Sequence, residues 1–446
     1  MRSLQSVLIN GDYARLWYGQ TISTFGDYIF TTTLVLWVAV DLGHAKPWAP
    51  AAVSGVLLAA SMAVLIVGPL TGVFVDRWNR RTTMLATEVF RGLLVAALTA
   101  LSFLPVRSLP VWVWLVAVYT VVFSLNAAGQ FFQPARFAIL GEIVEGEADR
   151  AKAAGLGQAT SSLAAIIAPP LAAPLLFSVG LQWALLVNAA SYGVSWFAIR
   201  SVRPGVGHVP VRVGGPRSGL RRDFVAGLKF FRGNQLLVAV LVIAVIAECG
   251  TGTLSALGVF FVTRNLHASA HLYGYLSTAL GLGGITGALI AGRVVRRIGA
   301  RTTTLAGLFL SGMLVVAYSR QTVFLAGLIL LFCVAVPITV LNTALAPLML
   351  AATPEEFRGR VLAVFNPVYQ LASMLSVIAA GWLASSVLRN LSFSVARLQF
   401  GPIDTIFTAA GLLVMAAGCY AVVGLPAHVS GQEPSAAKDG QPAARS

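Results

Sequence analysis

Two acidic side chains lie inside long hydrophobic stretches of this chain, where a charged group is costly. Asp27 falls about twelve residues into the stretch 14–40, and Glu248 about thirteen residues into the stretch 235–262. A carboxylate at the centre of a bilayer costs about 2.5–3.5 kcal/mol on insertion scales, and such groups often exchange protons or bind ions. We therefore expect Asp27 to couple proton movement, and Glu248 to assist it or to bind a cationic substrate. The alternative is that each acid stays protonated and only hydrogen-bonds a neighbouring helix.

A second pair of charged residues, Glu88 and Arg91, lies in the stretch 83–104. Residues three apart share a helix face, so we expect a structural ion pair near the cytoplasmic end of this helix. Apart from Arg15 and Arg200 at the ends of their stretches, Arg91 is the one Lys or Arg inside a hydrophobic stretch, and it is not central to it. A site for a phosphate or dicarboxylate places its cation deep in the protein, so an anionic substrate is disfavoured.

Uncharged polar side chains within or at the ends of these stretches are candidates for the lining of a central cavity. A lining of amides, acids and apolar groups suits amphipathic organic molecules better than small sugars or ions. The alternative for each residue is a hydrogen bond that holds two helices together. The candidates are Gln20, Tyr28, Asn126, Gln130, Gln158, Asn342, Asn366, Tyr369 and Gln370.

The elements that must position these residues are membrane-spanning helices. Of the 446 residues, 57% are hydrophobic and 11% charged, too few polar groups to cover a soluble protein of this size. Runs of about eighteen apolar residues can cross a hydrocarbon core of ~30 Å, and backbone groups in lipid are satisfied within helices. We expect an all-α membrane protein with twelve spans: 14–40, 51–75, 83–104, 111–133, 156–179, 183–202, 235–262, 271–292, 302–319, 322–346, 361–388 and 402–424.

The net charge of +15 is distributed unevenly between alternate loops. The loops on the side of the two termini contain 24 Lys and Arg residues, and those on the other side contain six. Lys and Arg are enriched in cytoplasmic loops, so we expect both termini in the cytoplasm of a bacterial-type inner membrane. This asymmetry also explains the basic composition without nucleic-acid binding.

The twelve spans divide into two related halves. We expect a bundle at 1–202, a cytoplasmic linker with an amphipathic helix at 203–234, a second bundle at 235–425 and a disordered tail at 426–446. The segment TGVFVDRWNRRTTML at 71–85 is echoed by TGALIAGRVVRRIGARTTTL at 286–305. An internal duplication predicts two pseudo-symmetric six-helix bundles with a site between them.

Several motifs resemble the major facilitator superfamily. GVFVDRWNRR at 72–81 matches its GxxxDRxxRR signature, and YARLWYGQTISTFGDYI, FFQPARFAIL and PEEFRGRVLAV resemble its macrolide-efflux and siderophore-exporter branch. The resemblance implies alternating access and a cytoplasmic gating loop. The residues of that loop and their expected partners are Gly72, Asp76, Arg77, Arg80, Arg81, Arg136, Arg358 and Arg360. The fifth span reads APPLAAPL and lacks the glycines of the stretch that is often linked to antiport.

Other chemistry has no support in the sequence. The chain contains no Gly-Lys dipeptide and hence no phosphate-binding loop for ATP. The five His residues show no metal-ligand pattern, and the three Cys residues lie in different spans. We expect neither an enzyme nor a cofactor or metal.

The resemblance and the residues together predict a monomeric exporter of amphipathic drug-like or metabolite molecules, driven by proton antiport. One alternative is an importer or a lipid or siderophore carrier of the same fold. The other is a membrane scaffold or sensor that does not transport. The expected partners are a small-molecule substrate, protons and the lipid bilayer.

Overall fold

The computed structural model of the chain describes residues 9–44, 46–75, 78–202, 228–354, 357–391, 393–395 and 398–425. Most of the expected linker (203–227) and the expected tail (426–446) lie outside the described residues. So do Asp76 and Arg77 of the gating loop.

The described chain is almost entirely helical, which confirms the expected all-α class. Twelve long helices follow one another in sequence: α2 (Gly11–Leu36), α3 (Ala49–Val75), α4 (Arg80–Ser102), α5 (Val111–Ile143), α6 (Glu147–Pro174), α7 (Leu181–Ser201), α9 (Gln235–Arg264), α10 (Gly274–Ile298), α11 (Ala300–Ser319), α12 (Phe324–Ala351), α13 (Arg358–Trp382) and α14 (Pro402–Gly424). Short π-helical turns extend three of them, namely η1 (Trp37–Leu42), η3 (Leu175–Val179) and η6 (Leu383–Val387). Single 3₁₀ turns, η2 (Val106–Ser108) and η4 (Ala270–Leu272), lie in two connections.

Eleven of these helices are long and apolar enough to cross a membrane, counted over the described residues; α7 is the exception. Several helices are longer than the expected spans. Thus α5 continues to Ile143, α6 already begins at Glu147, and α12 continues to Ala351. Hydropathy marks only the apolar part of a helix, so polar turns that project beyond it were missed.

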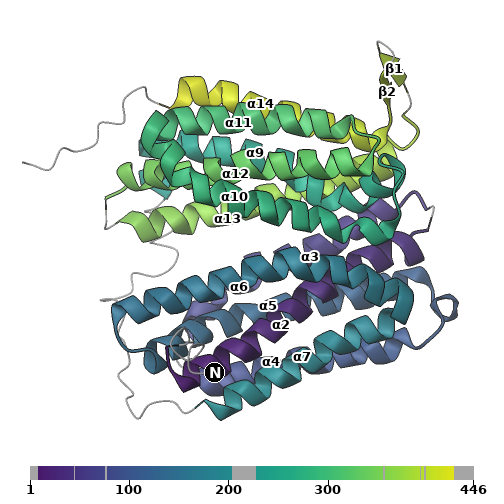
Figure 1. Ribbon diagram of the computed structural model, residues 1–446, viewed down its shortest axis with the longest axis vertical. Coiled ribbons are helices and arrows are strands. Elements are labelled where there is room, and N and C mark those ends of the chain that lie inside the picture. The colour runs from purple at the N-terminus through teal and green to yellow at the C-terminus, as the bar shows by residue number, and fades with distance from the viewer. Residues whose placement is uncertain are drawn as a thin grey trace, which may run out of the picture.

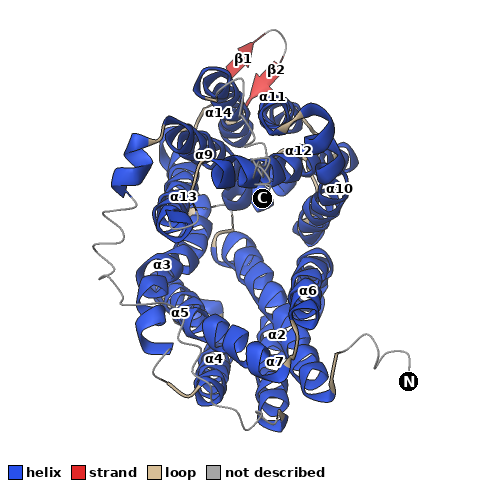
Figure 2. Cartoon of the chain, turned by 90° about the vertical axis from the view of Figure 1, so that its left-hand side faces the viewer, coloured by secondary structure: helices blue, strands red, loops and turns tan. Residues whose placement is uncertain are grey.

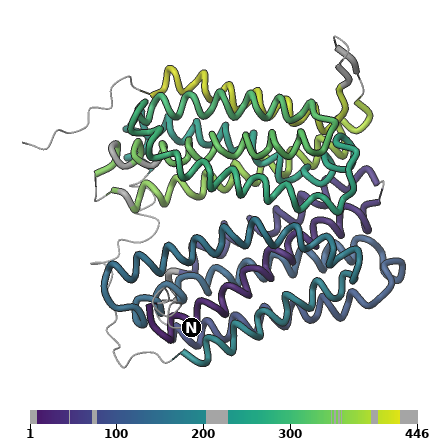
Figure 3. The backbone as a smooth tube through the Cα atoms, viewed as in Figure 1, coloured from purple at the N-terminus to yellow at the C-terminus, as the bar shows by residue number. Residues whose placement is uncertain are grey.

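The helices form two bundles, α2 to α7 and α9 to α14. Figure 1 shows the first bundle below the second, and Figure 3 shows the same division by colour, with the purple-to-teal chain below and the green-to-yellow chain above. Within the first bundle α2 packs against α6 and α7; within the second, α9 packs against α13 and α14. The two bundles contact each other mainly through α3 with α13 and α6 with α10, which lie side by side in Figure 2.

The two bundles repeat a capping arrangement at the first helix of each. Asn10 caps α2, and its amide donates to the Ile143 carbonyl at the end of α5, 2.6 Å away. Asn234 caps α9, and its amide donates to the Ala352 carbonyl just after α12, 3.0 Å away. Each asparagine therefore ties the first helix of its bundle to the end of the fourth helix, as an internal duplication predicts.

The hydrogen bonds between the bundles lie towards the helix ends opposite the termini. Thr278 on α10 donates to the Ile166 carbonyl on α6 over 2.6 Å. The Ala51 amide at the start of α3 donates to Ser385 of η6 over 3.0 Å. In Figure 1 the two bundles come together on the right and diverge towards the left.

One feature was not expected from the sequence. The strands β1 (Phe393–Val395) and β2 (Leu398–Phe400) form a small antiparallel hairpin before α14. Residues 228–233, the described end of the expected amphipathic segment, are helical. Here Phe231 is 2% exposed and packs with Val361 and Val364 of α13, so this end is anchored to the second bundle.

Candidate functional site

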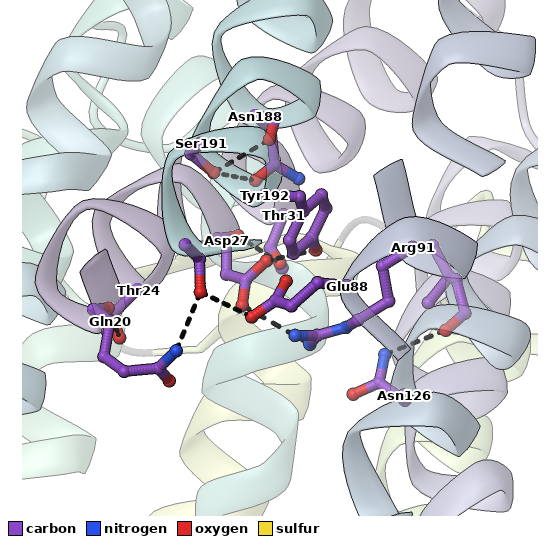
Figure 4. Close-up of polar contacts among 12 residues, drawn as sticks. Gln20, Thr24, Asp27, Thr31, Glu88, Arg91, Asn126, Asn188, Ser191 and Tyr192 are labelled. Carbon is purple, nitrogen blue, oxygen red and sulfur yellow. Dashed lines mark hydrogen bonds and ion pairs between the residues drawn. The ribbon is translucent and has the colours of Figure 1, made fainter. Parts of the chain in front are cut away.

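Asp27 lies inside the first bundle, where α2 faces α4 and α7. The Tyr192 hydroxyl donates to one of its carboxylate oxygens at 2.5 Å, and an Arg91 nitrogen lies 3.5 Å from the other. The Arg91 guanidinium also lies over the Tyr192 ring, 4.9 Å from its centre. Figure 4 shows Asp27 between these two side chains. The Asp27 side chain is 37% exposed and that of Arg91 14%, so the acid is the more exposed member of the pair.

Two glycines on α2 bring α7 close enough for Tyr192 to reach Asp27. A Cβ on Gly26 would lie 2.5 Å from the Ser191 hydroxyl oxygen, and a Cβ on Gly19 would lie 2.4 Å from the Cβ of Ala198. Any larger residue would push the helices apart, because real Cβ atoms do not approach so closely. The close packing of α2 on α7 therefore fixes the geometry around Asp27.

Glu88 lies beside this group and is 1% exposed. The Ser195 hydroxyl of α7 donates to one of its oxygens at 2.7 Å. Gln20 of α2 in turn donates to Ser195 at 2.8 Å, so the three residues form a chain of hydrogen bonds across α2, α7 and α4. The second oxygen of Glu88 is buried and has no hydrogen-bond partner.

The expected ion pair between Glu88 and Arg91 is not the one that the structure shows. Arg91 pairs with Asp27 on another helix, while Glu88 accepts from Ser195. Arg91 also lies eleven residues from either end of α4 and is thus central, contrary to expectation. The reason is that α4 begins at Arg80, after its cap Asn79, several residues before the apolar stretch. A central cation that is already paired with an acid still does not favour an anionic substrate.

A second polar centre surrounds Glu248 in the other bundle. The Tyr369 hydroxyl of α13 donates to Glu248 at 2.5 Å, and Thr251 donates to the same oxygen at 3.2 Å. A cavity of about 350 Å³ adjoins this carboxylate. Two amides, Asn342 and Asn366, line it together with apolar side chains of α9, α12 and α13. Over the described residues, Glu248 pairs with no Lys or Arg.

The structure thus brings together Glu248, Asn342, Asn366 and Tyr369 of the expected cavity residues. Gln20 belongs to the Glu88 group instead. The remaining candidates lie elsewhere. Asn126 donates to the Val122 carbonyl of its own helix, and Tyr28 packs beside Ile29. Gln130 faces Gly68 of α3, while Gln158 is exposed and Gln370 is half-buried.

The arginines expected near the gating loop contact neighbouring helix ends or nearby aromatic rings. Arg80 forms an ion pair with Glu142 at the end of α5, and Arg81 donates to the Arg200 carbonyl at the end of α7. Arg136 lies over the Phe137 ring at 5.7 Å and Arg360 over the Phe357 ring at 5.3 Å. Gly72 lies in the last turn of α3, and Arg358 begins α13.

Sequence reasoning missed Tyr192 and Ser195, which hold the two acids of the first bundle. A signal for them exists. Asn188, Ser191, Tyr192 and Ser195 recur three or four residues apart, so they form a polar stripe along one face of α7. That stripe faces α2 and α4.

Comparisons with known proteins agree with this architecture. A family model described as transmembrane secretion effector matches residues 3–439. The uncharacterized transporter YfiS of Bacillus subtilis is 25% identical over 84% of this chain and 87% of its own length. Macrolide efflux protein A of Streptococcus pyogenes is 28% identical over 51% of this chain, and the alignment spans only about half (53%) of that protein.

Solved structures of similar fold cover nearly the whole chain. A bacterial homologue of the iron transporter ferroportin, in an inward-facing state, matches with a TM-score of 0.70 and 13% identity over 92% of this chain and 98% of its own. A bacterial homologue of the lysosomal transporter Spinster, also inward-facing, matches with a TM-score of 0.65 and 12% identity over 92% and 95% of the two chains. At these identities the likeness defines the fold alone.

The two helical bundles and their internal polar centres define a multi-pass membrane transporter, and not an enzyme. The chain belongs to the transmembrane secretion effector family of the major facilitator superfamily.

Proposed function

We propose that the protein exports amphipathic drug-like or metabolite molecules by proton antiport, with Asp27 as the coupling site. The observation that carries this proposal is the pairing of a partly exposed carboxylate with Arg91 and Tyr192 between three helices. Protonation of Asp27 would remove one charge of this pair and weaken the contact of α2 with α4. Moving one charge through a potential of 100 mV supplies about 2.3 kcal/mol before any pH gradient, so protons can drive export.

Export is supported by the names of relatives, since macrolide efflux protein A and the chloramphenicol resistance protein CraA of Acinetobacter baumannii are among them. The latter is 24% identical over 69% of this chain and 70% of its own length. We place the chain in the bacterial inner membrane with both termini in the cytoplasm, because Lys and Arg gather in the loops on that side. We expect it to act as a monomer. It would use no nucleotide and no cofactor.

For the substrate we propose a molecule with an apolar body and a cationic group. Glu248 offers a carboxylate with no cationic partner among the described residues, and it borders a cavity with two amides. About 350 Å³ is near the small end of the ~300–1,000 Å³ usual for ligand sites. The gating loop, with Asp76 and Arg77, would close the cytoplasmic side through Arg136, Arg358 or Arg360.

Growth inhibition tests the proposed function. An efflux-deficient bacterium would express wild-type, Asp27→Asn or Asp76→Asn protein at matched membrane levels, across a panel of amphipathic antibiotics and dyes. We expect wild-type protein to raise the inhibitory concentration of some compounds, and both variants to return it to the vector value. If correctly inserted wild-type protein protects against no compound, or makes cells more sensitive, export of such molecules is wrong. Greater sensitivity would indicate uptake.

Glu248→Gln tests the proposed cation site. Because a hydrogen-bonded charge contributes about 1.5–3 kcal/mol, we expect affinity for cationic transported compounds to fall roughly tenfold to a hundredfold. Neutral compounds should be affected much less. Tyr369→Phe is the matched control, since it removes one hydrogen bond and keeps the negative charge. Binding to purified protein in detergent would be measured by tryptophan fluorescence, and equal losses for cationic and neutral ligands would count against the assignment.

A further inference from the structure

Three ionisable side chains share the interior of the first bundle, and their charges do not balance. Asp27, Glu88 and Arg91 provide two carboxyl groups and one guanidinium. Glu88 is 1% exposed, and the side chains that donate to it from the facing helices, Ser195 and Gln20, are both neutral. An ionised carboxylate so deeply buried needs a paired cation, whereas the protonated form does not. With Arg91 engaged by Asp27, Glu88 is therefore the carboxyl group that carries a proton.

Glu88 and Arg91 nevertheless have unused hydrogen-bonding atoms. The second carboxyl oxygen of Glu88 and the Nε of Arg91 are both buried without a partner. The two residues lie three apart on α4, close enough for a helix to bring their side chains together. Glu88 and Arg91 therefore have unpartnered atoms for a direct ion pair on one face of α4.

The groups around this triad limit what else could take part. From α7, Tyr192 faces Asp27 and Ser195 faces Glu88. From α5, Gly129 lies beside Arg91, where a Cβ would be 3.6 Å from the guanidinium. Over these facing positions, Asp27 and Glu88 are the two carboxyl groups that Arg91 can reach.

We propose that Asp27 and Glu88 share one proton and that Arg91 pairs with whichever of them is ionised. With Asp27 ionised, Arg91 pairs with Asp27 and Glu88 holds the proton. When Asp27 holds the proton, Glu88 is ionised and Arg91 pairs with Glu88. One proton leaves one carboxyl group as one joins the other, so the net charge of the triad stays constant. Glu88 is then a second proton site, and the inference rests on the proposed coupling role of Asp27.

Infrared spectroscopy of the purified protein at neutral pH tests this without any substrate, so the result does not depend on whether the protein exports anything. The observable is the C=O stretching band of a protonated carboxyl group. We expect this band in the wild-type protein and its loss in Glu88→Gln. We also expect its loss in Asp27→Asn, because Arg91 then pairs with Glu88 and ionises it. Glu248→Gln, in the other bundle, is the control for any band that arises outside the triad.

Two outcomes would overturn the proposal. A band that survives in Asp27→Asn but not in Glu88→Gln would mean that Glu88 holds a fixed, structural proton. A band unchanged in Glu88→Gln would mean that Glu88 is ionised already. Ser195→Ala keeps both acids and removes only the hydrogen bond, so it should shift the band to a different frequency and not abolish it.

Discussion

Replacing Arg91 by methionine is expected to destabilise the protein by about 3 kcal/mol and to abolish transport. Removal of one partner from a buried ion pair usually costs about 3–5 kcal/mol, because the other charge is left without compensation. We expect the low end of this range because the Asp27 side chain is 37% exposed and not fully buried. Methionine fills a similar volume, so loss of packing adds little. Thermal unfolding in one detergent at matched pH would measure the change.

The double variant Asp27→Asn/Arg91→Met separates charge from packing. It removes both members of the pair, so it should recover most of the lost stability while transport stays absent. Arg91→Lys keeps the charge and should retain more stability than Arg91→Met. If Arg91→Met unfolds at the wild-type temperature, the pair does not contribute to the stability of the first bundle. If the double variant is no more stable than the single one, packing and not charge is the cause.

Much of the fold follows from the sequence because a bilayer leaves few alternatives. Long apolar stretches must be helices there, so the spans could be placed by composition alone. The same constraint singles out Asp27 and Glu248, since a carboxylate in such a stretch is rare. Asn342, Asn366 and Tyr369 were expected to line a central cavity, and they line one beside Glu248 within the second bundle.

The partner of Arg91 could not be found in this way. Spacing along a helix favours a partner on the same helix, and Glu88 satisfied that rule. The actual partner depends on how closely α7 approaches α2, which Gly19 and Gly26 allow and which no local pattern reports. Some helices are also longer than the expected spans. The expected span 111–133 stopped before Pro134, but this proline lies within α5 and does not end it.

The contacts between the bundles have a consequence for the transport cycle. The N-terminal residue of α10, Gly274, approaches the backbone of α6 so closely that a Cβ would lie 2.3 Å from the Pro169 carbonyl oxygen. A backbone atom within a helix cannot move aside as a flexible side chain can. The conformation in which α6 and α10 touch is therefore available to glycine and is blocked for any larger residue at this position.

We expect Gly274→Ala to hold the bundles apart at this end and so to stop transport, while each bundle folds normally. Overpacking costs about 1–3 kcal/mol, which lowers the population of the closed conformation roughly fivefold to a hundredfold. The backbone nitrogen of Ala51 and the hydroxyl oxygen of Ser385 are 3.0 Å apart. Cysteines at these two positions would report closure by disulfide formation, once the three native cysteines are replaced by serine. Crosslinking should slow about tenfold in Gly274→Ala.

Gly284→Ala on the same helix is the matched control, because its nearest neighbour outside the helix, the Thr339 hydroxyl, would be at an ordinary 3.6 Å. It should crosslink and transport like the wild-type protein. Equal crosslinking in Gly274→Ala and Gly284→Ala would mean that α6 and α10 adjust locally and do not control closure. Slower crosslinking with unimpaired transport would mean that the cycle does not pass through this contact. Loss of both in Gly274→Ala alone would make the approach of α10 to α6 one of the two end states between which the bundles move.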